Sequence, residues 1–89
     1  MTAFVDVRID TRGSDCPAPL MEMIRAVQEA GIGQVVAVLS DDAMARTDIP
    51  LWTEKSGNEL LGVERHGAFD EIIVRKLPQD LSHAEDVGR

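Results

Sequence analysis

The chain has 89 residues, of which 44% are hydrophobic and 3% aromatic, with one cysteine and a formal net charge of −7. This length fits one domain with a modest aliphatic core, and the acidic charge disfavours direct binding of nucleic acid, which depends on basic side chains. One cysteine excludes an internal disulfide, and Cys and His do not occur at the spacings of a usual zinc site. No stretch approaches 18 apolar residues and the N-terminus carries no secretory apolar run, so we expect a cytoplasmic protein without membrane contact.

The first half of the chain reads as strand, loop, helix and strand. Residues 4–9 alternate apolar and polar side chains, which predicts a half-buried strand whose apolar face is made of Val5, Val7 and Ile9. A polar loop leads into residues 17–30, where apolar side chains recur at helical spacing and predict an amphipathic helix. Residues 35–39 form a nearly continuous apolar run, which is typical of an interior strand.

The second half reads as a helix followed by two strands. Asp48 is expected to cap the second helix, with Pro50 in its first turn and Gly57 at its end. Residues 59–65 and 69–76 predict two strands joined by a tight turn.

The predicted order is therefore βαβαββ. The first βαβ unit is expected to form a right-handed parallel crossover and the last two strands a hairpin. This predicts an α+β two-layer sandwich in which two helices cover one face of a four-stranded mixed sheet. We expect residues 1–77 to form this single domain, and residues 78–89, which have little apolar content, to form a polar, flexible tail.

Cys16 is the leading candidate for a functional residue. It stands in residues 12–19, Arg-Gly-Ser-Asp-Cys-Pro-Ala-Pro, where the loop gives way to the first helix. Pro17 suits the first helical position and pushes the residue before it toward extended backbone, so we expect Cys16 to be the N-cap. Free amides and the helix dipole would there favour a thiolate. The alternative is that Cys16 is a small buried hydrophobic residue, which the two prolines after it disfavour.

The residues around Cys16 have candidate roles of their own. Arg12 could favour an anionic sulfur, or it could form a surface ion pair with Asp10 or Asp15, and the sequence leaves both readings open. Gly13 is expected to serve the geometry of the backbone. Asp15 would oppose a thiolate if it faced the sulfur, so we expect it to point toward solvent or an amide.

A second group of residues could dock a partner protein. Asp41, Asp42 and Asp48 could form an acidic edge, although such residues more often form turns and caps. Met21 lies off the apolar stripe of the first helix and is a candidate for an exposed contact, whereas Met23 is expected in the core.

The two histidines offer no catalytic partner for Cys16. His66 is expected in the turn between the last two strands and His83 in the tail. Neither position is near Cys16 in the predicted fold, so a Cys-His pair is disfavoured. We also expect no bound metal.

The order of several short motifs resembles a known family. The motifs are Ile9-Asp10-x-Arg12-Gly13-x-x-Cys16-Pro17-x-Pro19, Asp41-Asp42, Asp48-Ile49-Pro50, Gly57, Glu59-Leu60 and Arg75-Lys76. Across about residues 5–77 the chain resembles the TusA/SirA family of small sulfur-carrier proteins. The resemblance implies a two-layer sandwich similar to the C-terminal domain of translation initiation factor 3. It also implies that Cys16 carries sulfane sulfur as a persulfide, with no other cofactor.

The function we expect is that of a sulfurtransferase-type carrier rather than a stand-alone enzyme. The resemblance implies a cysteine desulfurase or rhodanese-like donor and a downstream acceptor protein, in tRNA thiolation, molybdenum-cofactor-linked sulfur supply or sulfur oxidation. Arg12, Gly13, Pro17 and Pro19 would support the site. Because the chain has no second cysteine, a persulfide on Cys16 could not be resolved as an internal disulfide, and its sulfur would have to leave to another molecule.

Two other classes of function are weighed against this one. In the first, the chain is a non-enzymatic regulatory module that binds proteins, and the Cys-Pro-x-Pro helix start is only a rigid surface. In the second, suggested by fold analogy alone, it binds RNA, which the net charge of −7 disfavours.

Overall fold

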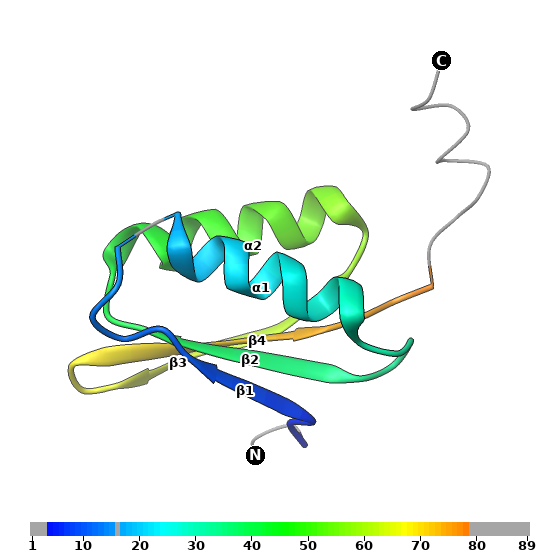
Figure 1. The fold of residues 1–89 in the computed structure, drawn as a ribbon, viewed down its shortest axis with the longest axis horizontal. Coiled ribbons are helices and arrows are strands. Elements are labelled where there is room, and N and C mark those ends of the chain that lie inside the picture. The colour runs from blue at the N-terminus through cyan, green and yellow to red at the C-terminus, as the bar shows by residue number, and fades with distance from the viewer. Residues whose placement is uncertain (1–3, 16, 79–89) are drawn as a thin grey trace.

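The computed structural model of the protein describes residues 4–15 and 17–78. Its elements are β1 (Val7–Asp10), α1 (Ala18–Glu29), β2 (Val35–Ser40), α2 (Ala43–Ser56), β3 (Glu59–His66) and β4 (Phe69–Arg75). Both helices lie on the same side of one four-stranded sheet (Figure 1). The predicted βαβαββ sandwich is therefore confirmed.

The sheet has the strand order β1-β2-β4-β3. β1 and β2 are parallel, as the crossover through α1 requires, whereas β4 is antiparallel to both β2 and β3. β2 thus has a neighbour on each edge, which confirms the interior strand that its apolar run predicted.

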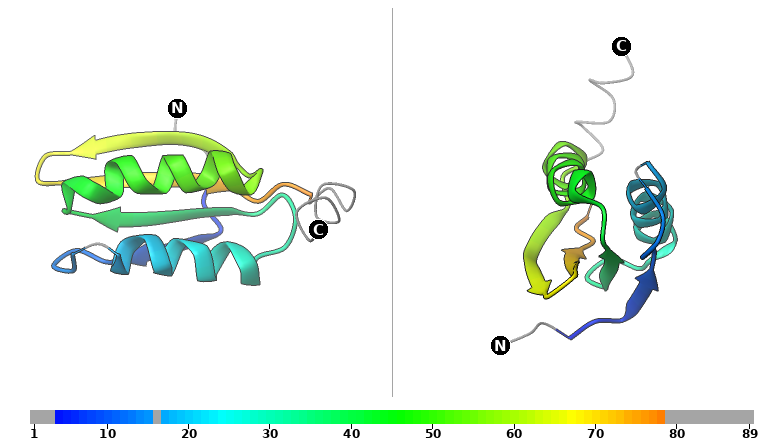
Figure 2. Two further views of the ribbon diagram at one scale, coloured as in Figure 1. Left: turned by 90° about the horizontal axis from the view of Figure 1, so that it is seen from above. Right: turned by 90° about the vertical axis from the view of Figure 1, so that its left-hand side faces the viewer.

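The main core lies between the sheet and the two helices (Figure 2). It is built from aliphatic side chains and Met23, each of them at most 2% exposed: Met23, Val27, Val36, Val38, Ala45, Ile49, Ile72 and Val74. Full burial of one large aliphatic side chain contributes about 1.5–3 kcal/mol relative to exposure. Met23 is in the core as predicted, and Met21, 59% exposed, is on the surface as predicted.

The start of α2 differs from the prediction. Asp42 is the N-cap, and its side chain accepts a hydrogen bond of 3.0 Å from the Met44 N–H. Asp48 lies inside the helix, so its predicted role as a cap is wrong. Pro50 also lies inside the helix, where it removes one backbone donor. Packing of one helix face onto the sheet offsets this loss, through the buried side chains of Ala45, Ile49 and Thr53.

The start of β1 also differs from the prediction. Val7 and Ile9 face the helices, but Val5 packs against the apolar cluster that contains Val35, on the opposite side of the sheet. Asp6 explains the change, because its carboxylate accepts the Val35 N–H at 2.8 Å and its own N–H donates to the Val35 carbonyl at 2.9 Å. This side-chain contact interrupts the regular strand, and the predicted alternation ends there.

The face of the sheet away from the helices is here called the open face (Figure 2). A small apolar cluster of Val35, Ala37 and Ile73 lies at its centre. Glu71 is two residues from Ile73 on β4 and points to the same side. Glu71 forms an ion pair of 2.9 Å with Arg8 of β1.

The predicted tail falls almost wholly on residues 79–89, which lie outside the described residues; Pro78 is exposed. Within residues 4–15 and 17–78, neither helix has the length and apolar character needed to cross a bilayer.

Candidate functional site

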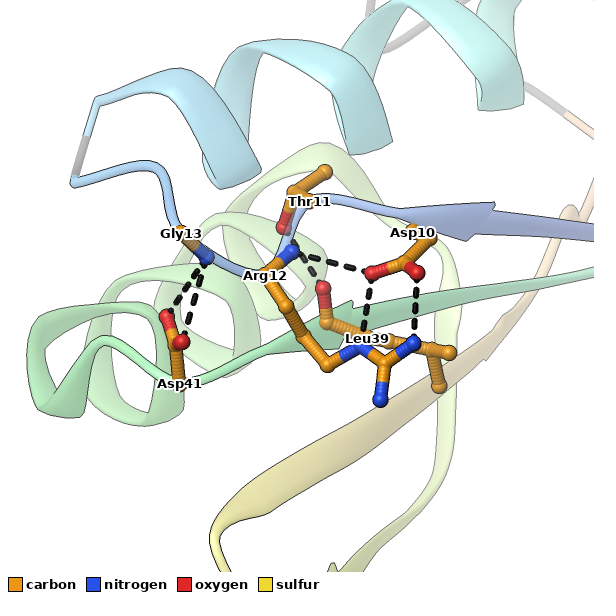
Figure 3. Close-up of polar contacts among 6 residues, drawn as sticks. All are labelled: Asp10, Thr11, Arg12, Gly13, Leu39 and Asp41. Atoms are coloured by element: carbon orange, nitrogen blue, oxygen red, sulfur yellow. Dashed lines mark hydrogen bonds and ion pairs between the residues drawn. The ribbon is translucent and has the colours of Figure 1, made fainter.

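The segment between β1 and α1 is anchored to the end of β2 by Thr11 (Figure 3). Thr11 is 6% exposed, and its hydroxyl donates a hydrogen bond of 2.6 Å to the Leu39 carbonyl. The Thr11 backbone N–H donates to the same carbonyl at 2.9 Å. These two bonds fix the chain eight residues before Pro19, the first buried residue of α1.

Gly13 makes the turn that follows. Its φ is +90°, a left-handed conformation that glycine adopts at low cost. Its N–H donates to both carboxylate oxygens of Asp41, each at 3.1 Å (Figure 3). Asp41 therefore ties the loop to the segment between β2 and α2, and Gly13 serves backbone geometry as predicted.

Arg12 forms the ion pair that was one of its two predicted roles. Its guanidinium donates to both oxygens of Asp10, at 2.8 and 2.7 Å, and its backbone N–H donates to the same carboxylate (Figure 3). These hydrogen bonds lower the pKa of Asp10 to about 2 and raise the pKa of Arg12. The guanidinium also lies 4.6 Å from the centre of the Phe69 ring. An additional contact with the sulfur of Cys16 stays a prediction.

Cys16 itself lies outside the described residues, but its predicted position as the N-cap of the helix is wrong. The helix begins one residue later than predicted, because Pro17 occupies the N-cap position and Ala18 is the first helical residue. Pro17 and Pro19 carry no backbone N–H, the Ala18 N–H donates to the Asp15 carbonyl at 2.9 Å, and the Met21 N–H to the Pro17 carbonyl at 2.9 Å. Pro17, Ala18, Pro19 and Met21 thus offer no free amide to an anion, whereas free amides at the helix start were predicted to favour a thiolate.

The candidate docking residues fall into two groups. Asp41 and Asp42 have the structural roles described above, as loop tie and helix cap, and both lie beside the loop that leads to α1. Asp48 is half-buried inside α2, and Met21 is exposed on the first turns of α1. Both helices begin at the same end of the molecule (Figure 1).

Sequence reasoning missed two residues of the site, Thr11 and Phe69. In the sequence Thr11 does not differ from the other polar residues of the loop. Its hydrogen bonds to the Leu39 carbonyl show that it anchors the loop to β2. Phe69 begins β4 and is nearly sixty positions from Arg12 in the sequence. The two side chains can meet because only one strand, β2, separates β1 from β4 in the sheet. Strand order across the sheet is the signal that would have found this contact.

The fold and this loop define a class of small α+β domains with one cysteine in the segment between the first strand and the first helix. The sequence model of the family described as Sulfurtransferase TusA matches residues 7–76. The chain therefore belongs to the TusA family of sulfur carriers.

Individual relatives agree with this assignment. The chain is 46% identical over 71 residues to a "Putative sulfur carrier protein" of Archaeoglobus fulgidus, covering 80% of this chain and 97% of the relative. It is 34% identical over 71 residues to "Sulfur carrier protein TusA" of Pseudomonas entomophila, covering 80% and 89%. The crystal structure of a SirA-like protein from Desulfitobacterium hafniense superposes with a TM-score of 0.72 at 27% identity, covering 81% and 99%.

Proposed function

We propose that the protein receives sulfane sulfur on Cys16 as a persulfide and delivers it to an acceptor protein. The Cys16 thiolate attacks the outer sulfur of a donor persulfide. A new S–S bond forms on Cys16, the S–S bond of the donor breaks, and the donor leaves as a thiolate. The same exchange with an acceptor thiolate then returns Cys16 to its original state, so the cycle needs no external oxidant or reductant.

The observation that carries the proposal is the position of Cys16 two residues before a twelve-residue helix, in a chain of the TusA family. The first turn of α1 holds no acidic side chain, so nothing there offsets the positive end of the helix dipole. Because Pro17 and Pro19 have no backbone N–H and the Ala18 N–H is bonded to the Asp15 carbonyl, we assign the stabilisation of a thiolate to this dipole rather than to hydrogen bonds from these three residues.

The loop before Cys16 supports this role by being held in place. Thr11 and Gly13 fasten it to β2 and to Asp41, and the rings of Pro17 and Pro19 restrict the backbone after it. The ion pair with Arg12 neutralises Asp10, the acidic side chain at the entrance to the loop. A fixed, exposed segment can present one sulfur to a donor and then to an acceptor.

Docking of these two partners is proposed for the end of the molecule where both helices begin. Met21 supplies an exposed, polarisable side chain there. Asp41 and Asp42, and Asp48 further along α2, supply negative charge that would suit a basic partner surface. The donor is proposed to be a cysteine desulfurase or rhodanese-like protein, and the destination of the sulfur to be tRNA thiolation, molybdenum-cofactor-linked sulfur supply or sulfur oxidation.

The proposal is tested by loading the protein from a persulfide donor and measuring its intact mass. We expect a gain of about 32 Da, one sulfur atom, that a reductant removes and that Cys16→Ser abolishes. If the wild-type mass stays unchanged beside a demonstrably loaded donor, the carrier function is wrong. If Cys16→Ser also keeps full function in cells, the binding-module alternative is favoured.

A further inference from the structure

Two carboxylates face each other across the β3–β4 hairpin on the open face. Glu64 and Glu71 are direct partners in the antiparallel register, and His66 lies two residues along β3, on the same face as Glu64. Like charges placed directly opposite each other destabilise a sheet. The pair therefore needs positive charge to offset it, and Arg8, which bonds only Glu71, supplies part of that charge.

The three side chains point toward one another. The His66 Nε2 atom lies 3.0 Å from Oε1 of Glu71 and 3.7 Å from Oε1 of Glu64. One donor atom from each residue lies within 4.8 Å of the other two. The Glu71 side chain is only 6% exposed, whereas those of Glu64 and His66 are 37% and 40% exposed. Glu71 is thus held in a buried position, whereas Glu64 and His66 are accessible to solvent.

We propose that Glu64, His66 and Glu71 bind a divalent transition-metal ion, with Zn²⁺ as the probe that defines the site. One imidazole nitrogen and two carboxylate oxygens are a donor set that Zn²⁺ accepts, and three protein ligands leave a fourth position for water. Zinc–ligand distances of about 2.0–2.2 Å place tetrahedral ligand atoms about 3.3 Å apart. Two of the three donor separations, 3.0 and 3.7 Å, bracket this value, and the third is no more than 4.8 Å.

The surroundings of the cluster orient its ligands. Arg8 Nε donates a hydrogen bond of 2.9 Å to Oε2 of Glu71, which leaves Oε1 directed at His66. The His66 ring stacks on Phe69, with ring centres 5.2 Å apart. Contacts of this kind, made by groups that do not themselves touch the metal, hold metal ligands in place. The Arg12 guanidinium also lies over the Phe69 ring, so the proposed metal site adjoins the loop that leads to Cys16.

The prediction that the chain binds no metal rested on the spacing of Cys and His along the sequence. This cluster escapes such a search because it contains a single histidine. Its two carboxylates come together only through the register of the hairpin. The inference stands apart from the proposed sulfur-carrier function, since none of its three ligands belongs to the loop before Cys16 or is Cys16 itself.

Isothermal titration calorimetry with Zn²⁺ at neutral pH tests the site. The protein should carry Cys16→Ser, because a thiolate would itself bind zinc. We expect one equivalent to bind, with the affinity reduced about tenfold or more by either His66→Ala or Glu71→Gln. The matched controls are His83→Ala, at the only other histidine, and Glu59→Gln, another glutamate of β3 in an ion pair with Arg75. Both should bind as the parent does.

A second measurement separates lost ligands from lost folding. Thermal unfolding without metal should show a cooperative transition in both variants, and added Zn²⁺ should raise the midpoint of the parent but not that of His66→Ala. Zinc binding that survives His66→Ala, or that disappears only with His83→Ala, would overturn the assignment. So would a Cys16→Ser protein that binds no zinc.

Discussion

Replacing Gly13 by alanine tests the geometry of the loop before Cys16. A Cβ at this position would meet no atom within 4 Å, so the substitution adds no clash. Its cost comes from the φ of +90° alone. Left-handed backbone costs an L-residue about 1–2 kcal/mol, and the smaller backbone entropy of alanine in the unfolded chain returns about 0.4–1 kcal/mol. We therefore expect a net loss of about 1 kcal/mol.

Urea unfolding of the purified protein measures this loss, which corresponds to a fall in Tm of about 4–8 °C for a domain of this size. Gly62→Ala is the matched control, because Gly62 also has open space around a Cβ but no positive φ. It should cost nothing or stabilise β3, since alanine is the better strand residue. A synthetic protein with D-alanine at position 13 should recover the stability, because the D-residue favours positive φ. Equal losses with L- and D-alanine would refute the reasoning.

Three further predictions concern a cap, a titration and a contact surface. Asp42→Ala should destabilise the protein by about 1 kcal/mol in urea unfolding through loss of the α2 cap, whereas Asp42→Asn should keep the cap; equal losses would contradict this role. The pKa of Asp10, at about 2, is below the value of about 3.9 in an unfolded chain, so its stabilising contribution is present above about pH 4–5 and is lost as the pH falls toward 2. Asp10→Asn should flatten that part of the stability profile, and an unchanged slope would disprove the coupling to Arg12. Met21→Glu should slow sulfur loading from a protein donor but not from a small-molecule persulfide, and equal slowing of both would place Met21 outside the docking surface.

The element order could be predicted from the sequence because hydrophobic spacing and element type agree along most of the chain. The β-branched run at residues 35–39 fits only a buried strand, and β2 has that place. Gly57 ends α2 in a left-handed conformation, as a glycine after a helical pattern indicates.

Where the prediction of an element boundary was wrong, tertiary packing or a side-chain contact outweighed local preference. Pro50 indicates a helix start, and Asp48 before it resembles a cap. Burial of the Ala45 and Ile49 side chains against the sheet instead carries α2 through the proline, from a cap at Asp42. At β1, the hydrogen bonds between Asp6 and Val35 decide where the alternation begins, and a pattern of apolar residues does not contain that information.

The candidate site was predictable only where its residues are neighbours in sequence. Gly13, Arg12 and Asp10 lie within four consecutive residues, and local reasoning anticipated the role of Gly13 and the ion pair. Phe69 and the cluster on the open face depend on which strands pair and in which register. The two-residue turn between β3 and β4 sets the register that brings His66 and Glu71 together. His66 was expected in that turn, whereas the structure has it as the last residue of β3, so this meeting was missed.

The most direct test of the sulfur-carrier function is a transfer experiment with the loaded protein. The protein is loaded, separated from its donor, mixed with an acceptor thiol, and both masses are followed over time. We predict that the protein loses one sulfur, about 32 Da, that the acceptor gains it, and that the peptide containing Cys16 returns to a free thiol. A sulfur that stays on the protein, or that is carried at any position other than Cys16, would contradict the account.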